Sequence, residues 1–173
     1  MFKLCVCIPT MNRAQFIGQT LDSIVPELGT DVEVVIVDGS PDDATEEVVS
    51  KYQEQYAAIR YFRRTNESGR PSNAGFDRDC SWSVELARAE YCWLMTDDDL
   101  LKPGALRQVV ARLDERHDLI VVACEVRDEN LQETLLKVRP VLAGDVVFQP
   151  SQWERFFSAA ITHLTFVGAV VIR

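Results

Sequence analysis

The sequence predicts a three-layer α/β domain in which helices cover both faces of a mostly parallel sheet. Short apolar runs rich in β-branched residues alternate along the chain with segments whose apolar residues recur at helical spacing. Polar residues follow the ends of several of these runs, at the edge where such sheets bind ligands. The length of 173 residues suits one ordinary domain, so we expect residues 1–173 to fold as a single unit.

The N-terminal part predicts a βαβ unit. Residues 4–8 are a short apolar run closed by Pro9, and residues 32–37 are a second run rich in β-branched residues. Both are typical of buried parallel strands. Five apolar residues between them recur on one face of a helix: Ile17, Leu21, Ile24, Val25 and Leu28.

A second helix and a third strand follow. Residues 42–47 place capping and acidic side chains where they stabilise a helix N-terminus. The strand covers residues 59–62, and residues 63–73 predict an exposed loop because they combine several turn formers without periodicity. The helix between them is expected to bury Val48, Val49, Tyr52 and Tyr56.

Two further helix–strand pairs complete the expected sheet. A third helix is marked by Phe76, Cys80, Val84 and Ala87, and a fourth strand by residues 91–95. Pro103 predicts the first turn of a fourth helix, and residues 119–124 predict a fifth strand. The inward face of the fourth helix is expected to consist of Leu106, Val109, Val110 and Leu113.

The pattern is weaker beyond residue 125. Residues 127–130 predict a turn, and residues 131–141 an irregular strand pair. A short helix that begins near Gln149 carries Trp153, Phe156 and Phe157. Residues 166–172 form an apolar strand at the end of the sequence, so we expect the natural chain to continue past Arg173.

The composition excludes several classes of protein. The net charge of −9 argues against a general nucleic-acid binder, whose affinity depends on cationic side chains. No apolar run approaches the roughly 20 residues of a membrane span, and none resembles a signal peptide. We expect a cytoplasmic protein, with peripheral membrane association and the oligomeric state left open. Five cysteines without a C-x-x-C pair predict reduced thiols.

Polar residues follow three predicted strands. The first strand is followed by Thr10, Asn12 and Arg13, the second by Asp38, and the fourth by three aspartates at positions 97–99. Because parallel strands joined by right-handed crossovers point the same way, we expect these residues to line one crevice.

The aspartate triplet has two interpretations. Adjacent carboxylates after a buried strand need a compensating charge, and Mg²⁺ or Mn²⁺ supplies it through oxygen ligands while bridging substrate phosphates. The triplet would then be a metal site composed of Asp97, Asp98 and Asp99. Alternatively, it is a solvated turn whose last member stabilises the start of the next helix.

The remaining polar residues also allow two roles. Asp38 could accept hydrogen bonds from a nucleoside or form the turn before Gly39. Asn12 and Arg13 could bind phosphate or cap the first helix. The basic residues Arg63, Arg64, Arg70 and Arg78 could face a diphosphate or form a solvated surface.

Three motifs together resemble the family 2 glycosyltransferases of the GT-A fold, a Rossmann-like α/β/α sandwich. They are Pro9-Thr10-x-Asn12-Arg13, the segment from Val37-Asp38-Gly39-Ser40 to Thr45, and the segment from Glu90-Tyr91 through Asp97-Asp98-Asp99 to Leu106. The resemblance covers about the first 125 residues, and the segment 77–94 is similar to the abequosyltransferase-type branch that builds bacterial surface polysaccharides.

The resemblance implies transfer of a sugar, with inversion, from a nucleotide-diphosphate donor to an acceptor hydroxyl. Residues 1–125 would bind a UDP-, CDP-, GDP- or dTDP-linked sugar, and residues 126–173 would begin the side that meets a saccharide or lipid-linked saccharide acceptor. Thr10 and Asp38 would contact the nucleoside, and Arg78 would lie near the base or diphosphate. Asp97 with Asp98 or Asp99 would hold metal and ribose.

The resemblance places the general base of the reaction beyond Arg173, so no catalytic residue is assigned within the sequence. This leaves a second hypothesis, a fragment or module that binds a nucleotide-sugar without turning it over. A third, a metal-dependent nucleotidyltransferase, explains the aspartates but not the first two motifs.

Overall fold

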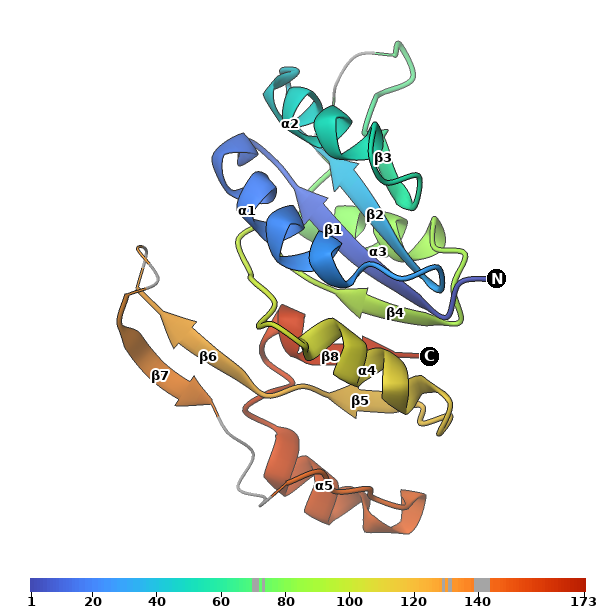
Figure 1. Ribbon diagram of the computed structural model, residues 1–173, viewed down its shortest axis with the longest axis vertical. Helices are drawn as coiled ribbons and strands as arrows, with labels where there is room; N and C mark the ends of the chain where they lie inside the picture. The colour runs from blue at the N-terminus through green and yellow to red at the C-terminus, as the bar shows by residue number, and fades with distance from the viewer. Residues whose placement is uncertain (70–71, 73, 129, 131, 139–143) are drawn as a thin grey trace.

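The computed structural model describes residues 1–69, 72, 74–128, 130, 132–138 and 144–173. It contains a six-stranded sheet in the order β3-β2-β1-β4-β8-β5 and a separate two-stranded hairpin (Figure 1). The strands of the sheet are β1 Leu4–Thr10, β2 Val32–Asp38, β3 Ile59–Arg63, β4 Tyr91–Leu94, β8 Val170–Ile172 and β5 Leu119–Val121. The hairpin pairs β6 Cys124–Arg127 with β7 Thr134–Val138.

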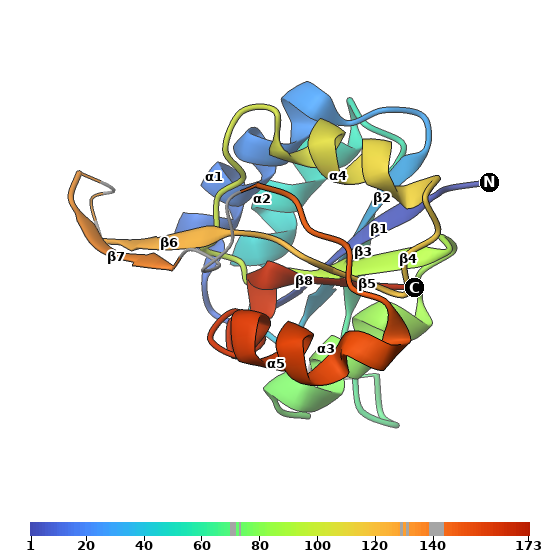
Figure 2. The same cartoon turned by 90° about the horizontal axis from the view of Figure 1, so that it is seen from below.

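Helices lie on both faces of the sheet, which confirms the predicted three layers. Figure 2 shows α1, α2 and α4 on one side of the strands and α3 and α5 on the other. Their bounds are α1 Ala14–Ile24, α2 Ala44–Gln53, α3 Phe76–Glu85, α4 Ala105–Leu113 and α5 Trp153–Ala160. Short 3-10 turns cover η1 Val25–Glu27, η2 Pro150–Gln152 and η3 Val167–Ala169. None of the helices in the described part of the chain has the length and hydropathy needed to span a bilayer.

Strands β1 and β2 are buried on both faces, as their apolar sequences predict. Alternate residues of β1 serve opposite layers: Val6 and Ile8 pack in the core shared with α1 and α4, whereas Cys5 and Cys7 lie in a smaller cluster on the α3 side. All five cysteines are free, in agreement with the expected reduced thiols. This packing fixes the carboxyl end of β1, where the first polar residues stand.

The strand order reverses next to β1. The chain runs from β1 to β2 and β3 on one side and then returns to place β4 on the other side of β1, with all these neighbouring pairs parallel. Strands diverge at such a switch point and leave a crevice at their carboxyl ends, where open α/β sheets bind ligands. The crevice lies between Thr10 at the end of β1 and the segment that follows β4.

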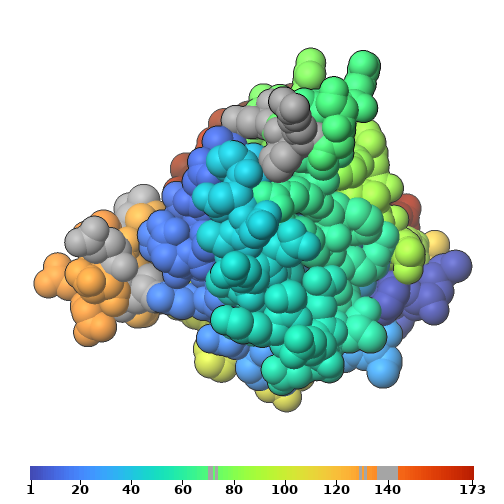
Figure 3. All heavy atoms as spheres, turned by 90° about the horizontal axis from the view of Figure 1, so that it is seen from above, coloured from blue at the N-terminus to red at the C-terminus, as the bar shows by residue number. Residues whose placement is uncertain are grey.

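The C-terminal half differs from the prediction. Residues 119–124 do not form one strand, because β5 ends at Val121 and Cys124 already begins β6 in the hairpin. β8 lies between β4 and β5 and is antiparallel to both. The hairpin leaves the sheet and projects from the side of the molecule (Figures 2 and 3). Apolar periodicity cannot show this, since it reports burial and not the direction of the paired strand.

Two helices also differ in detail. The expected inner face of α3 is wrong, because Phe76 and Val84 are 52% and 42% exposed while Asp79 and Ser83 are buried. The α4 helix begins two residues after Pro103, with Gly104 at its N-cap in a left-handed conformation (φ 87°). Of the predicted loop and strand-pair residues, Arg70 and positions 71, 73, 129, 131 and 139–143 lie outside the described residues.

Candidate functional site

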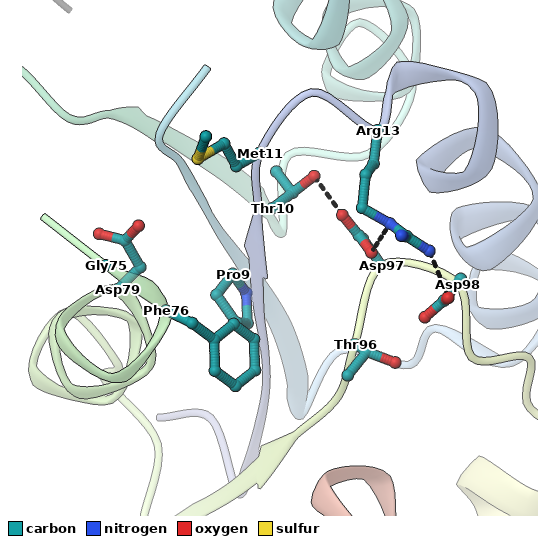
Figure 4. A pocket seen from close by; sticks show the side chains of 10 residues that line it. All are labelled: Pro9, Thr10, Met11, Arg13, Gly75, Phe76, Asp79, Thr96, Asp97 and Asp98. Atoms are coloured by element: carbon teal, nitrogen blue, oxygen red, sulfur yellow. Dashed lines mark hydrogen bonds and ion pairs between the residues drawn. The ribbon is translucent and has the colours of Figure 1, made fainter. Parts of the chain in front are cut away.

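A cavity of about 340 Å³ opens at the switch point of the sheet. Its walls come from three parts of the chain: the end of β1, the first turn of α3, and the segment after β4 (Figure 4). The residues that line it are Pro9, Thr10, Met11, Arg13, Gly75, Phe76, Asp79, Thr96, Asp97 and Asp98. Polar residues that follow β1 and β4 therefore line one crevice, as predicted.

Asp97 links the segment after β4 to the end of β1. It is buried, and its Oδ2 accepts a hydrogen bond of 2.6 Å from the Thr10 hydroxyl. Burial raises the pKa of Asp97 above its usual range; the Thr10 hydrogen bond and the charge of Arg13 oppose the rise, and the charge of Asp98 adds to it. The Asp97 carbonyl also accepts a 2.8 Å hydrogen bond from the hydroxyl of Thr20 on α1. Asp97 is thus fixed in position by both β1 and α1.

Arg13 lies between two of the aspartates. Its Nε is 2.8 Å from Asp97 Oδ1, and its Nη2 contacts Asp98 Oδ2 (Figure 4). Nε is not aligned for a hydrogen bond with Asp97, so this contact is an ion pair. The guanidinium carbon also lies 4.7 Å from the centre of the Phe16 ring.

The third aspartate turns away from this group. Asp99 is exposed, is absent from the cavity lining, and lies against Gly168, where a Cβ atom would come within 2.6 Å of Asp99 Oδ2. Asp98 is also exposed but faces the cavity, with 46% of its side chain accessible. The triplet therefore divides into a buried member, a member that faces the cavity, and a member that faces the C-terminal segment.

Asp38 lies behind the cavity wall. Its side chain is fully buried, and its oxygens accept hydrogen bonds from the Ser40 amide at 2.8 Å, from the Ser40 hydroxyl, and from the Tyr61 hydroxyl at 2.7 Å. Burial and the hydrogen bond to Asp38 raise the pKa of Tyr61, which keeps the phenol protonated as a donor. The backbone N–H of Asn12 donates to Ser40 Oγ at 2.8 Å, and Asn12 adopts φ 57°, a conformation that asparagine tolerates well.

The three described arginines of the predicted basic cluster, Arg63, Arg64 and Arg78, are not among the residues that line the cavity. Arg63 binds Asp43 and the Asp42 carbonyl at the start of α2. Arg64 pairs with buried Asp79 and lies 4.6 Å from the Trp82 ring centre. Arg78 is exposed on the first turn of α3, beside the lining residues Phe76 and Asp79.

Several lining residues on the α3 side are not among those predicted from the sequence. Phe76 fits the helical apolar period and is therefore expected in the core, but its side chain lines the cavity, as does Pro9 (Figure 4). The sequence carries one signal for Asp79, which is a carboxylate in the first turn of a helix that follows Arg63 and Arg64. Met11 and Gly75 carry no signal of their own, since only the fold brings them here.

The donor set at the cavity suits a hard divalent cation. In the part of the chain that the structure describes, no three His, Cys, Asp or Glu side chains are grouped as ligands of one ion. Mg²⁺ and Mn²⁺ sites at phosphate-binding proteins often use only one or two carboxylates, with substrate phosphates and water as the remaining ligands. Asp97 and Asp98 supply such a pair, and a positively charged group already lies between them.

The family comparison identifies the class of protein to which the chain is similar. The family model described as glycosyl transferase family 2 matches residues 5–171. Abequosyltransferase RfbV of Salmonella typhimurium is 33% identical over 115 residues, which cover 65% of this chain and 33% of RfbV. A GalNAc(5)-diNAcBac-PP-undecaprenol beta-1,3-glucosyltransferase of Campylobacter jejuni is 29% identical over 130 residues, covering 73% of this chain and 40% of that protein.

Solved structures agree on the fold. Staphylococcus aureus TarS 1–349 superimposes with a TM-score of 0.70 at 22% identity, covering 99% of this chain and 47% of that one. Mannosyltransferase PcManGT of Pyrobaculum calidifontis, in complex with GDP-Man and Mn²⁺, gives a TM-score of 0.63 at 18% identity, with coverage of 98% and 43%. The fold is therefore the predicted GT-A fold, and the chain spans less than half the length of these relatives. With the family model matched over nearly all of its residues, the chain belongs to glycosyl transferase family 2.

Proposed function

We propose that the cavity between β1 and β4 is the donor site of a metal-dependent, inverting glycosyltransferase, and that these residues form its nucleotide-sugar-binding part. The observation that carries the proposal is the position of Asp97 and Asp98. Both carboxylates line the cavity at the switch point of the sheet, in a chain of this family. A nucleotidyltransferase would need the same carboxylates but gains no support from the family match.

Different lining residues would contact different parts of the donor. Pro9, Thr10 and the buried Asp97 form the inner wall, which suits the nucleoside. Asp98 is the accessible carboxylate and would hold the cation, with Asp97 as the second ligand. When bound, the metal would supply Lewis-acid neutralisation of the diphosphate leaving group.

Three other predicted donor residues act from around the cavity in this proposal. Asp38 and Asn12 meet at Ser40 and hold the ends of β1 and β2 together, so they support the site from behind. Arg78 is exposed on the first turn of α3, next in sequence to the lining residue Asp79, and its side chain suits a phosphate or base approaching from solvent.

The donor class follows from the same site and from its relatives. TarS has been solved in complex with UDP-GlcNAc, and PcManGT in complex with GDP-Man and Mn²⁺. These names support a nucleotide-diphosphate sugar and a divalent cation as ligands of this chain. The names of RfbV and of the undecaprenol-linked glucosyltransferase support a saccharide or lipid-linked saccharide acceptor and a role in bacterial surface polysaccharide synthesis.

A thermal-shift panel tests the donor site. A ligand that binds only the native state stabilises it by about 2.7 kcal/mol at roughly 100 times its Kd, which raises the Tm of a domain of this size by several degrees. Among UDP, CDP, GDP and dTDP, each with and without Mn²⁺, we expect one nucleotide to stabilise the protein strongly and only when Mn²⁺ is present. If no nucleotide diphosphate moves the Tm, the assignment of the cavity as a donor site is wrong.

Two alanine variants localise the effect. Asp98→Ala removes the accessible carboxylate and is expected to abolish the metal-dependent part of the shift while the protein stays folded. Glu85→Ala removes an exposed carboxylate at the end of α3 and should keep the wild-type response. Equal responses from the two variants would place the metal elsewhere.

A further inference from the structure

Arg13 pairs with two of the carboxylates that line the cavity, Asp97 and Asp98. Arg13 Nε lies 2.8 Å from Asp97 Oδ1, and Nη2 contacts Asp98 Oδ2, so the guanidinium spans the pair (Figure 4). The two acids differ in accessibility, with 6% of the Asp97 side chain exposed against 46% of that of Asp98. The contact with Asp98 is therefore the one that solvent and ligands can reach.

The position of Arg13 conflicts with a cation at the same carboxylates. A divalent ion at Asp98 would stand beside a guanidinium that never loses its charge under ordinary conditions. The aspartates, in turn, cannot remain adjacent and unpaired without cost. A metal and Arg13 are thus competing cations at Asp98, and each weakens the binding of the other there.

Arg13 has the freedom to give way. It is the N-cap residue of α1, just outside the regular helix, and 39% of its side chain is exposed. Its other contact is the face of the Phe16 ring, which is itself partly exposed and lies on the same helix. The guanidinium can leave Asp98 without any change in the backbone of the sheet.

We propose that Arg13 is the counter-cation of Asp97 and Asp98 in the donor-free protein, and that it exchanges Asp98 for the diphosphate when metal and donor bind together. The proposal rests on the proposed donor site. The guanidinium fork matches phosphate oxygens as well as carboxylates, so the displaced side chain gains a new partner only when a diphosphate is present. Metal alone then binds weakly, and metal and nucleotide increase each other's affinity by the same factor.

Binding of Mn²⁺ alone is the direct readout. Free Mn²⁺ can be followed by electron paramagnetic resonance during titration of the whole chain, without nucleotide and without any activity measurement. Arg13→Gln removes the competing charge and keeps a polar side chain of similar length. We expect its affinity for Mn²⁺ alone to rise about tenfold over wild type, corresponding to about 1.4 kcal/mol, and the mutual enhancement by nucleoside diphosphate to shrink.

Two matched variants separate this effect from net charge and from folding. Arg88→Gln removes an exposed arginine just before β4, at the opposite edge of the sheet, and should bind Mn²⁺ like the wild type. Arg13→Lys keeps a positive charge and should also leave the affinity for Mn²⁺ alone close to wild type. If Arg13→Gln proves too unstable to titrate, an increase in its Tm by Mn²⁺ that exceeds the increase in wild type gives the same answer.

The outcomes distinguish this proposal from the donor site itself. Unchanged affinity of Arg13→Gln for Mn²⁺ alone would overturn the exchange, even where the nucleotide panel still supports the donor site. Failure of both proteins to bind Mn²⁺ with nucleotide present would overturn the metal site, and the exchange with it.

Discussion

At the scale of single residues, Thr10 and Asp97 connect the fold to the proposed chemistry. Thr10 ends β1 and Asp97 follows the adjacent parallel strand β4, and the Thr10 hydroxyl is the hydrogen-bond donor for a carboxylate that is almost completely buried. A buried acceptor that loses its partner bears the cost of desolvation without compensation. The contact is therefore expected to matter for stability before any ligand is bound.

Thr10→Val tests this contact. Valine has nearly the same shape but no hydroxyl, so we expect the free energy of unfolding in urea to fall by about 1–3 kcal/mol. Thr10→Ser keeps the hydroxyl and should lose considerably less. Equal losses for the valine and serine variants would show that the hydrogen bond to Asp97 contributes little.

Some residues of the site could be predicted from the sequence, and others could not. Thr10, Arg13, Asp97 and Asp98 were expected in one crevice, and they line one cavity because their strand ends are fixed by topology. The burial of Asp38 could not be predicted, because its partner Tyr61 lies on another strand and only the register of β2 with β3 brings them together. The contact of Arg13 with both aspartates depends on side-chain rotamers, which no sequence pattern specifies.

At the scale of elements, the start of α4 is stabilised by a residue from a distant helix. Gly104, at the N-cap, has no side chain, and its amide is bound by Glu27 Oε1 from η1. Glu27 Oε2 accepts a second hydrogen bond of 3.1 Å from the Arg107 amide. A carboxylate at this position also interacts favourably with the helix dipole. Glu27 therefore caps α4 and ties it to the end of α1.

Glu27→Gln is expected to reduce the free energy of unfolding by about 1–2 kcal/mol at neutral pH, since the amide keeps the shape but loses the charge. Burial raises the pKa of Glu27, but the hydrogen bonds from Gly104 and Arg107 and the charge of Arg107 outweigh it, so the net pKa is lowered. A lowered pKa means that the contribution is complete above the unfolded value of about 4.3 and is lost as the pH falls through the folded value.

The measurement is urea unfolding of wild type and Glu27→Gln at a series of pH values. The difference between them should be constant at neutral pH and shrink on acidification below about pH 4. A difference that persists unchanged at low pH would mean that shape, and not charge, accounts for the effect.

The element-level errors have a common cause. The pattern predicts all five α-helices of the described part of the chain, but it places Phe76 in the core and predicts one strand over residues 119–124. In the first case Asp79 replaces an apolar residue on the buried face because Arg64 neutralises it there. In the second, the strand that pairs with β5 is β8, which lies about 50 residues further along the chain. Both depend on contacts distant in sequence.

At the scale of the whole molecule, the net charge of −9 acquires a specific meaning. The charge argues against a general nucleic-acid binder, yet Asp97 and Asp98 in the cavity are arranged around a positive charge. The central claim is that this cavity, at the carboxyl end of β1, takes a nucleoside diphosphate together with a divalent cation. Strand β1 offers a series of residues at increasing distance from the cavity for testing this claim, because Thr10 stands at its cavity end and Leu4 at its other end.

Paramagnetic broadening by Mn²⁺ in the amide NMR spectrum, recorded with the nucleotide that stabilises the protein, tests this claim most directly. The account predicts the strongest broadening at Thr10, Thr96 and Asp98, a decline along β1 toward Leu4, and loss of the pattern in Asp98→Asn. Broadening centred instead on another acidic surface, such as the start of α2 around Asp42 and Asp43, would contradict it.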